Sequence, residues 1–372
     1  MAGPVVITGG GTGGHVFPMQ AVAEALRSSG LSASDLRFVG SRRGQEGRLL
    51  GSGDIELTLL PGRGLRRSLR PKDIVINVGA GLGLTSALIT AFVLVRRWRP
   101  SVVVSVGGYA SFAVSFAAAC WRTPLVLVEL DATSGAAQRL VARRAIKRCC
   151  AFPSDGDNDV VTGAPIRAEI ENIDRSIDAR RLAKSHATPP IDAERSVVVV
   201  MTGSLGSTRV NTAVSELAAL WSTRRDRTII HVTGRRDYGE VQRHVPELKG
   251  LDYRVVEFGD MTVLWALADV AVCRAGAMTL AELTALSIPS VLVPLPNAPD
   301  DHQSKNAQAV VVAGGAELIV DAHCDAVALG ATLERILVPS SLFAMARGAG
   351  TLAHHDAARA IAAVILEVRE SP

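Results

Sequence analysis

Short apolar runs alternate with longer amphipathic segments along most of the chain. In the first half, runs of strand length occupy residues 4–9, 36–40, 56–61, 101–108, 124–130 and 148–153. After a polar tract the pattern restarts, with runs at 196–203, 228–234, 253–259, 270–276, 289–296 and 317–320. Strands that alternate with helix-length segments are typical of parallel sheets built from β-α-β units. Two such series predict an α/β protein with two doubly wound parallel-sheet domains.

The restart of the pattern sets the predicted domain boundaries. A chain of 372 residues exceeds what a single hydrophobic core usually fills. We expect an N-terminal domain over 1–166, a charged and proline-bearing linker over 167–195, and a C-terminal domain over 196–345. In the remaining segment, 346–372, a helix from about His355 to Glu370 is predicted to return to the first domain.

Composition narrows the class of partner. A net charge of +4 and a pI near 8.9 are mildly basic, while aromatic residues make up only 4% of the chain. Nucleic-acid binders carry denser basic stripes and stacking aromatics, so we expect no nucleic acid partner. An anionic small substrate or an anionic membrane surface fits this composition better. The five cysteines show no C-x-x-C spacing and the N-terminus has no basic n-region, which favours reduced, buried thiols in a cytoplasmic protein.

Residues 74–95 form an uncharged run of membrane-spanning length, closed by the basic segment RRWRP. Asn77 and three glycines weaken its first half. Three interpretations stay open: a helix packed on a sheet, a partly exposed apolar patch that docks on a bilayer between basic flanks, and a true span.

Three glycine-rich loops follow predicted strands, at residues 9–14, 107–111 and 203–207. Ligands of open parallel sheets collect at the carboxyl ends of the strands, where loops run into helix N-termini that favour anions. One such loop is a weak signal, but three in two domains predict a cleft that contacts phosphates from both sides.

The first loop also matches the G-x-G-x-x-G fingerprint of dinucleotide cradles through Gly9, Gly11 and Gly14. Arg42 and Arg43 follow the second predicted strand and leave an NADP-binding protein open. His15, directly after the loop, argues against it, because a dinucleotide cradle has no use for a titratable side chain at that place.

A second cluster lies late in the chain. Glu282 falls about one turn into a predicted helix, and Gln303 follows another strand end beside Asp301, His302 and Asn306. A carboxylate and an amide on neighbouring loops suit the hydroxyls of a sugar, which need directed acceptors and donors. The alternative for Glu282 is a solvated first-turn carboxylate that favours the helix dipole.

Five motifs together resemble those of the MurG family of glycosyltransferases, in that family's order and spacing. They are TGGGTGGHVFP at 8–18, VGGYAS at 106–111, GAPIR at 163–167, CRAGAMTLAE at 273–282 and DDHQSKNA at 300–307. The resemblance implies two Rossmann-like domains in the GT-B arrangement, facing a central cleft. It also implies a metal-independent hexosyltransferase that moves GlcNAc from UDP-GlcNAc to the C4 hydroxyl of lipid I, with inversion, on the cytoplasmic surface of the cell membrane.

The resemblance assigns residues to these ligands. His15 is the candidate general base beside the acceptor, and Glu282 is the second catalytic candidate. Tyr109 and the second loop would line the acceptor diphosphate site. Donor contacts are implied for Thr12, Gly13, Gly14, Arg167, Ser204, Phe258, Ala277, Met278, Thr279, Leu280, Ala281 and Gln303.

An inverting transfer needs a base for the acceptor proton and a way to offset charge on the departing UDP. Helix N-termini and Arg167 can supply the second without a metal or cofactor, and we predict neither. The acidic segment 154–160 is interpreted as a surface loop, because it lacks the glycine and terminal glutamate of a calcium loop.

The chain departs from the family pattern at VELDATSG, residues 128–135, where Val128, Leu130 and Asp131 replace a histidine, a glutamine and an asparagine. Asp131 would place a negative charge near a substrate diphosphate. This departure leaves two alternatives open: a related GT-B transferase of UDP-sugars with another acceptor, and a UDP-sugar epimerase or hydrolase.

Overall fold

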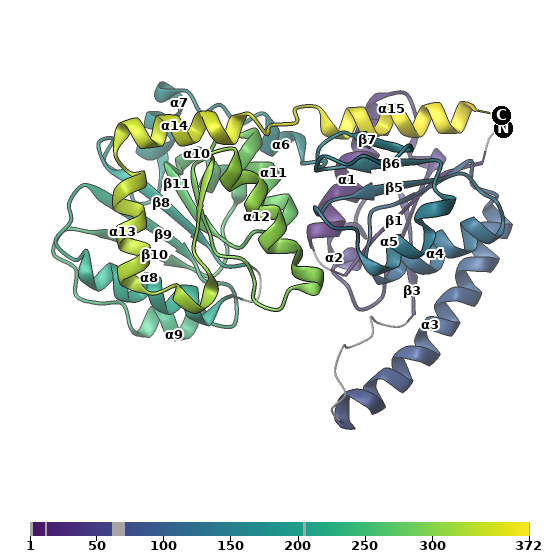
Figure 1. Ribbon diagram of the computed structural model, residues 1–372, viewed down its shortest axis with the longest axis horizontal. Coiled ribbons are helices and arrows are strands. Elements are labelled where there is room, and N and C mark those ends of the chain that lie inside the picture. Colours follow the sequence, from purple (N-terminus) through teal and green to yellow (C-terminus); the bar gives the residue numbers. More distant parts are fainter. Residues whose placement is uncertain (1–2, 12, 62–70, 204–205, 372) are drawn as a thin grey trace. The chain divides into compact units, whose positions relative to one another are not determined.

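The computed structural model describes residues 3–11, 13–61, 71–203 and 206–371; for 71–82 and for Tyr109 it describes the backbone only. The chain divides into two compact units (Figure 1). Unit 1 contains residues 1–167 and 356–372, and unit 2 contains residues 168–355.

Unit 1 is built on a seven-stranded parallel sheet with the order β3-β2-β1-β4-β5-β6-β7. Its strands are β1 (Val5–Thr8), β2 (Leu36–Ser41), β3 (Glu56–Leu60), β4 (Val102–Ser105), β5 (Leu125–Glu129), β6 (Lys147–Cys150) and β7 (Asp159–Val161). Its helices are α1 (Gly13–Ser28), α2 (Glu46–Leu49), α3 (Pro71–Trp98), α4 (Tyr109–Cys120), α5 (Ala136–Val141) and α15 (Ala357–Glu370).

Unit 2 repeats the plan with a six-stranded parallel sheet in the order β10-β9-β8-β11-β12-β13. Its strands are β8 (Ser196–Met201), β9 (Arg227–Val232), β10 (Asp252–Val256), β11 (Val270–Cys273), β12 (Ser290–Leu292) and β13 (Ala316–Leu318). Its helices are α6 (Ala168–Glu171), α7 (Ile177–His186), α8 (Thr208–Leu220), α9 (Tyr238–Arg243), α10 (Met261–Leu267), α11 (Ala277–Ala285), α12 (His302–Val312), α13 (Ala326–Ile336) and α14 (Pro339–Gly350). The two sheets confirm the predicted pair of doubly wound α/β domains.

The apolar runs become the buried strands because parallel strands are covered by helices on both faces. Strand β8 is an example: Val197, Val198, Val199 and Val200 are all buried, and they alternate between two hydrophobic clusters on opposite faces of the sheet. In unit 1, α15 packs against α1 and against strands β4, β5 and β6 (Figure 1). The last helix therefore completes the cover of the first sheet, although the whole of unit 2 lies between that sheet and this helix in the sequence.

One segment and one cysteine differ from their expected form. The segment 167–195, expected as a linker, contains α6 and α7, and Ile170 and Ile191 are buried in the core of unit 2. These isolated apolar residues lie in a strongly charged sequence, which hides them from a periodicity argument. Cys120, expected to be buried, is exposed at the end of α4, whereas the other four cysteines are buried.

Helix α3 contains the uncharged run of residues 74–95. In its C-terminal half, Ala87, Ala91 and Val95 recur every four residues and are buried in the core of unit 1, while Ile89 and Val93 are 62% and 58% exposed. The helix thus packs with one face and exposes apolar side chains on the other. Among the described residues, only α13 and α14 taken together, bent by 89°, reach the length and hydropathy of a membrane crossing, and no single helix does.

Candidate active site

The strand order places one ligand-binding position on each sheet. In unit 1 the order reverses between β1 and β4, and in unit 2 it reverses between β8 and β11. Such switch points open a crevice at the carboxyl ends of the two neighbouring strands. The first and second glycine loops follow β1 and β4, and the third loop and the CRAG segment follow β8 and β11.

The first two glycine loops contact each other. Gly108 has a φ of +91°, and a Cβ atom placed on it would lie 2.1 Å from the carbonyl oxygen of Gly10. Only glycine fits both this backbone conformation and this spacing. Gly108 also occupies the N-cap position of α4, so the backbones of the two loops meet at Gly10 and Gly108, at the carboxyl ends of β1 and β4.

His15 lies in the first turn of α1, half-buried, with its ring against the second glycine loop. A Cβ atom on Gly107 would lie 3.2 Å from Cδ2 and 3.3 Å from Nε2 of His15. The side chain of Gln138 approaches the same point and is fixed, because its Nε2 donates to the carbonyl oxygens of Ser105 at 3.1 Å and Val128 at 3.0 Å. The imidazole is therefore held at the switch point of unit 1.

Other predicted residues of unit 1 surround this helix start. Gly13 and Gly14 are the first two residues of α1. The guanidinium of Arg167 lies 4.5 Å from the ring centroid of Phe17, which belongs to α1. Thr12 and the side chain of Tyr109 lie outside the described residues.

The departure at VELDATSG surrounds a buried acid. Glu129 ends β5 and is 4% exposed, and burial raises the pKa of its carboxyl to about 7, against the opposing effect of Arg148. Asp131, half-buried two residues later, raises the same pKa further. The segment thus holds two acids close together at the carboxyl end of β5.

The third glycine loop is packed against the loop after β9. A Cβ atom on Gly206, whose φ is +82°, would lie 2.5 Å from the carbonyl oxygen of Thr233. The N–H of Gly206 donates to the carbonyl oxygen of Gly203 at 3.0 Å, and Ser207 caps α8. Ser204 lies outside the described residues.

Arg274 joins the two loops at the switch point of unit 2. Its guanidinium donates to Ser207 Oγ at 2.6 Å and to the carbonyl oxygens of Val293 and Pro294 at 3.0 and 3.1 Å. It also forms an ion pair with Asp321 at 2.6 Å. The residue directly follows a buried strand inside a motif that the sequence singled out, but nothing in its pattern indicated that it would bridge four segments.

The helix start after β11 carries the other catalytic candidate. Gly276 precedes α11 and offers no side chain to cap it, so the first N–H groups of the helix are left for a ligand. Ala277, Met278, Thr279, Leu280 and Ala281 form the first five residues of this helix. Glu282 follows, and its Oε2 accepts a 2.8 Å hydrogen bond from the indole Nε1 of the buried Trp265. The carboxylate is therefore oriented by the core and is not a solvated end of a helix.

Gln303 and Phe258 lie at other strand ends of the same sheet. Gln303 is in the first turn of α12, and its Oε1 accepts from the N–H of Leu295 at 2.9 Å, which fixes its side-chain amide. Phe258, after β10, is 49% exposed, and the Arg235 guanidinium lies 5.5 Å from its ring centroid.

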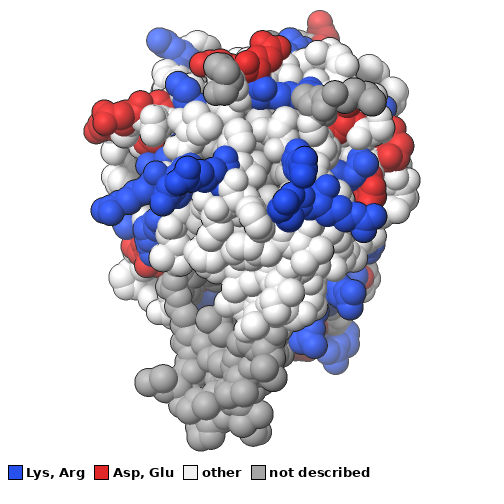
Figure 2. All heavy atoms as spheres, turned by 90° about the vertical axis from the view of Figure 1, so that its right-hand side faces the viewer, with Lys and Arg blue, Asp and Glu red and all other residues white. Residues whose placement is uncertain are grey.

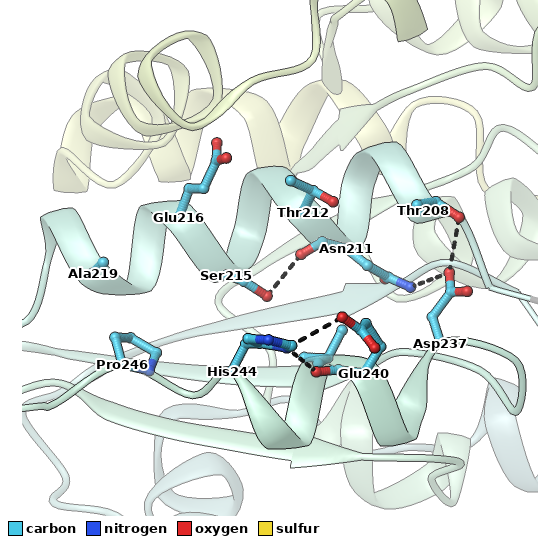
Figure 3. A pocket seen from close by; sticks show the side chains of 11 residues that line it. Thr208, Asn211, Thr212, Ser215, Glu216, Ala219, Asp237, Glu240, His244 and Pro246 are labelled. Atoms are coloured by element: carbon cyan, nitrogen blue, oxygen red, sulfur yellow. Dashed lines mark hydrogen bonds and ion pairs between the residues drawn. The ribbon is translucent and has the colours of Figure 1, made fainter.

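A groove of about 410 Å³ lies between α8 and α9, and its lining begins at Thr208, the residue after the third glycine loop (Figure 3). At its end, Asn211 Nδ2 donates to Asp237 at 2.8 Å. Asn211 Oδ1 contacts Nε2 of the buried His231 at 2.9 Å, and His231 Nδ1 contacts the Tyr253 hydroxyl at 2.8 Å. Burial lowers the pKa of His231 to about 3. This buried chain of side chains fixes α8, and with it the third loop, on the sheet.

The acidic segment 154–160, expected to be a surface loop, ends in strand β7, where the side chain of Asp159 is buried. Asp159 begins β7, forms an ion pair with Arg148 at 3.3 Å and accepts a hydrogen bond from Ser154. Among the described residues, no group of three or more His, Cys, Asp or Glu side chains is placed to hold a metal ion.

Comparison with known proteins places both units in one family. Residues 5–149 match the model of the glycosyltransferase family 28 N-terminal domain, and residues 197–361 match that of the family 28 C-terminal domain. The chain is 35% identical over 373 residues to a protein of Pseudomonas aeruginosa (strain LESB58), with 99% of both chains covered. It is 37% identical over 375 residues to one of Alkalilimnicola ehrlichii, again with 99% of each covered. Both relatives are named UDP-N-acetylglucosamine--N-acetylmuramyl-(pentapeptide) pyrophosphoryl-undecaprenol N-acetylglucosamine transferase.

Among solved structures, the fold is similar to that of MurG from Acinetobacter baumannii. The TM-score is 0.76 at 25% sequence identity, and the match covers 98% of this chain and 99% of that one.

Proposed function

The chain belongs to glycosyltransferase family 28, and we propose that it transfers N-acetylglucosamine from UDP-GlcNAc to the C4 hydroxyl of the N-acetylmuramoyl sugar of lipid I. The product is lipid II, a precursor of peptidoglycan. One observation carries the proposal: relatives bearing the name of this transferase match the chain from end to end, through both sheets.

The chemistry of transfer divides between the two helix starts. His15 takes the proton from the C4 hydroxyl, whose oxygen then attacks the anomeric carbon of GlcNAc. The bond from that carbon to the UDP oxygen breaks as the new bond forms, which inverts the anomeric centre. The first N–H groups of α11 and the Arg167 guanidinium stabilise the negative charge that develops on UDP.

Unit 2 is the proposed donor unit. Glu282, oriented by Trp265, and residues Ala277–Ala281 contact the ribose and diphosphate, and Ser204 contributes from the third loop. Gln303 binds hydroxyls of GlcNAc through its fixed amide. Phe258 lies by the uracil, where its exposed ring and backbone form one side of the base site.

Unit 1 is the proposed acceptor unit. The lipid diphosphate lies on the second loop, with Tyr109 at the start of α4. Thr12, Gly13 and Gly14 of the first loop are proposed to contact the donor. His15, against Gly107, faces the acceptor sugar.

An apolar face of unit 1 is proposed to dock on the cytoplasmic surface of the membrane that carries the lipid acceptor. The exposed side chains of Ile89, Val93, Phe116 and Trp121 form this face, and the Arg96 guanidinium lies 5.5 Å from the Trp121 ring. On this end of unit 1, Lys and Arg side chains gather beside uncharged surface (Figure 2). Apolar insertion and attraction to anionic lipid would act together there.

Cys120 offers a direct probe of this docking, because it is the one exposed cysteine among the five and neighbours Trp121. An environment-sensitive dye on Cys120 should shift to the blue with vesicles containing anionic phospholipid. Zwitterionic vesicles and high salt should weaken the shift, and an unchanged spectrum with anionic vesicles would remove this face from the proposal.

The transfer itself is tested by incubating the protein with radiolabelled UDP-GlcNAc and a lipid I analogue, without divalent metal. We expect label in the lipid fraction and an equal amount of free UDP. Release of UDP without label in lipid would indicate a hydrolase, and conversion of UDP-GlcNAc to another UDP-sugar would indicate an epimerase.

A related transferase with another acceptor is the second candidate, and Asp131 is the observation that favours it. The extra carboxylate lies near Glu129, in a segment where the family pattern has an amide. Transfer of label to another undecaprenyl-linked or glycolipid acceptor, but not to lipid I, would favour this candidate.

A further inference from the structure

Glu46 is a fully buried acid beneath the first glycine loop. It is the first residue of the short helix α2 and is 0% exposed. Its Oε1 accepts two backbone hydrogen bonds, from the N–H of Gly11 at 2.9 Å and from the N–H of Ser41 at 3.0 Å. A single oxygen thus joins the loop after β1 to the end of β2.

Three glycines leave the space that this carboxylate fills. A Cβ atom on Gly10 would lie 1.8 Å from Oε1, one on Gly44 would lie 1.7 Å from Oε2, and one on Gly40 would lie 2.8 Å from Cγ. These glycines come from the first loop, from β2 and from the turn before α2. The surroundings hold the Glu46 side chain on several sides, so its oxygen has little freedom to move.

The bond to Gly11 reaches the proposed catalytic base through a short path. Gly11 is 2 residues before the start of α1 and 4 residues before His15. On the other side, Gly10 contacts Gly108, and the His15 ring lies against Gly107. A shift of the Gly11 backbone would therefore move the helix start that carries His15 relative to the second loop.

We propose that Glu46 is a positioning residue for His15 and the first glycine loop, acting through the N–H of Gly11. The proposal rests on the function proposed above, since it assigns Glu46 to the placement of the acceptor's base. The proposal depends on where the side-chain oxygen that accepts the hydrogen bond from Gly11 lies. It therefore predicts different outcomes for two conservative variants of Glu46. Glu46→Gln keeps a carbonyl oxygen at the same reach, whereas Glu46→Asp keeps the charge but withdraws the oxygen by one methylene.

The experiment combines hydrogen exchange of the loop with steady-state kinetics. For Glu46→Asp we expect at least tenfold faster exchange in the peptide spanning 9–15, with peptides of unit 2 unchanged. We expect kcat to fall by about tenfold or more, since small misplacements of catalytic groups carry large penalties, and KM for UDP-GlcNAc to change by a smaller factor. Glu46→Gln should remain within about threefold of the wild type in both measurements.

Glu56→Asp is the matched control, because Glu56 is an exposed acid of the same unit, paired with Arg37 at 3.0 Å. It should change neither exchange nor kcat. Circular dichroism and thermal unfolding of each variant separate a local loosening from a loss of fold.

Several results would overturn the proposal. Wild-type exchange in Glu46→Asp, faster exchange without a fall in kcat, or an equal loss of kcat in Glu46→Gln would each contradict it. If Glu46→Asp does not fold, hydrogen exchange of the wild type still tests the proposal. Gly11 is exposed, so its amide is protected from exchange only if it donates to Glu46. Exchange of that amide at the rate of an unbonded amide would exclude the bond to Glu46. A wild type that transfers no sugar would refute the proposed function, whereas the exchange data would still report whether Glu46 holds the loop.

Discussion

The two units support their glycine loops by opposite kinds of hydrogen bonding. Both must hold a glycine loop rigid at a switch point. In unit 1 a buried acid, Glu46, accepts hydrogen bonds from loop N–H groups. In unit 2 a mostly buried cation, Arg274, donates to carbonyl oxygens and to Ser207 Oγ.

The difference shows that topology fixes where a loop lies and leaves the means of support to individual side chains. The two units also differ in their buried titratable groups. Unit 1 contains Glu129, whose pKa is raised to about 7, and unit 2 contains His231, whose pKa is lowered to about 3. The units should therefore respond to pH in opposite directions.

The largest expected effect is that of His15→Ala, which removes the proposed base from unit 1. We expect kcat to fall by about 10² to 10⁴, the usual contribution of a general base. His244→Ala, which changes an exposed histidine of unit 2, is the control and should leave kcat unchanged. Normal turnover in His15→Ala would assign the base to another group.

Arg274→Ala should be the largest perturbation of the loop support in unit 2. It leaves Asp321, whose side chain is only 15% exposed, with only its longer ion pair to the half-exposed Arg209 at 3.5 Å, and removes the bond to Ser207. Breaking a mostly buried ion pair of this kind lowers the free energy of unfolding by about 3 kcal/mol. Chemical denaturation measures this loss, and calorimetry should show at least tenfold weaker binding of UDP-GlcNAc. An Arg274→Ala protein with wild-type stability and donor affinity would contradict the bridging role.

Glu129 should make unit 1 less stable as pH rises. The folded protein holds a proton on Glu129 that the unfolded chain releases near pH 4.5, so its contribution is complete below that pH and is lost as pH rises through about 7. The loss amounts to about 3 kcal/mol by pH 8. Denaturation of Glu129→Gln between pH 5 and 8 should show a smaller decline than the wild type, and identical slopes would show that Glu129 does not carry this dependence.

His231 should give unit 2 the opposite dependence, and at pH 5 its loss of stability is still smaller than the loss that Glu129 causes by pH 8. The unfolded chain binds a proton on His231 near pH 6.5, whereas the buried ring in the folded protein binds one only near pH 3. The contribution of His231 to the free energy of unfolding is therefore complete above pH 6.5 and is lost as pH falls below it. The loss is about 2 kcal/mol at pH 5. His231→Gln should flatten this acid decline, whatever its absolute stability, and an unchanged slope would assign the decline to other groups.

Strands were predictable from the sequence because a parallel strand buried on both faces is a continuous apolar run, as in β8. Strand β7 was missed, since its three residues begin with an aspartate in a polar segment. Helices α6 and α7 were missed because their few buried side chains, such as Ile170, are isolated among charges.

Motif positions indicated His15, Glu282 and Gln303. The structure places His15 and Gln303 in the first turns of α1 and α12 and Glu282 in the second turn of α11, and each helix follows a strand end. The supporting residues were not predictable in the same way. Glu46 lies in SRRGQEGRLL, which has the composition of a surface loop, and its burial depends on glycines from three separate segments. Such roles depend on tertiary packing that no local pattern records.

The central claim is that unit 1 supplies the base and unit 2 holds the donor. Calorimetric titration of His15→Ala and Glu282→Ala with UDP-GlcNAc, beside their transfer rates, tests it most directly. We expect His15→Ala to bind the donor with wild-type affinity while losing transfer, and Glu282→Ala to bind it about tenfold or more weakly, through the loss of a carboxylate that hydrogen-bonds the ribose. Weakened donor binding in His15→Ala together with wild-type binding in Glu282→Ala would contradict the account.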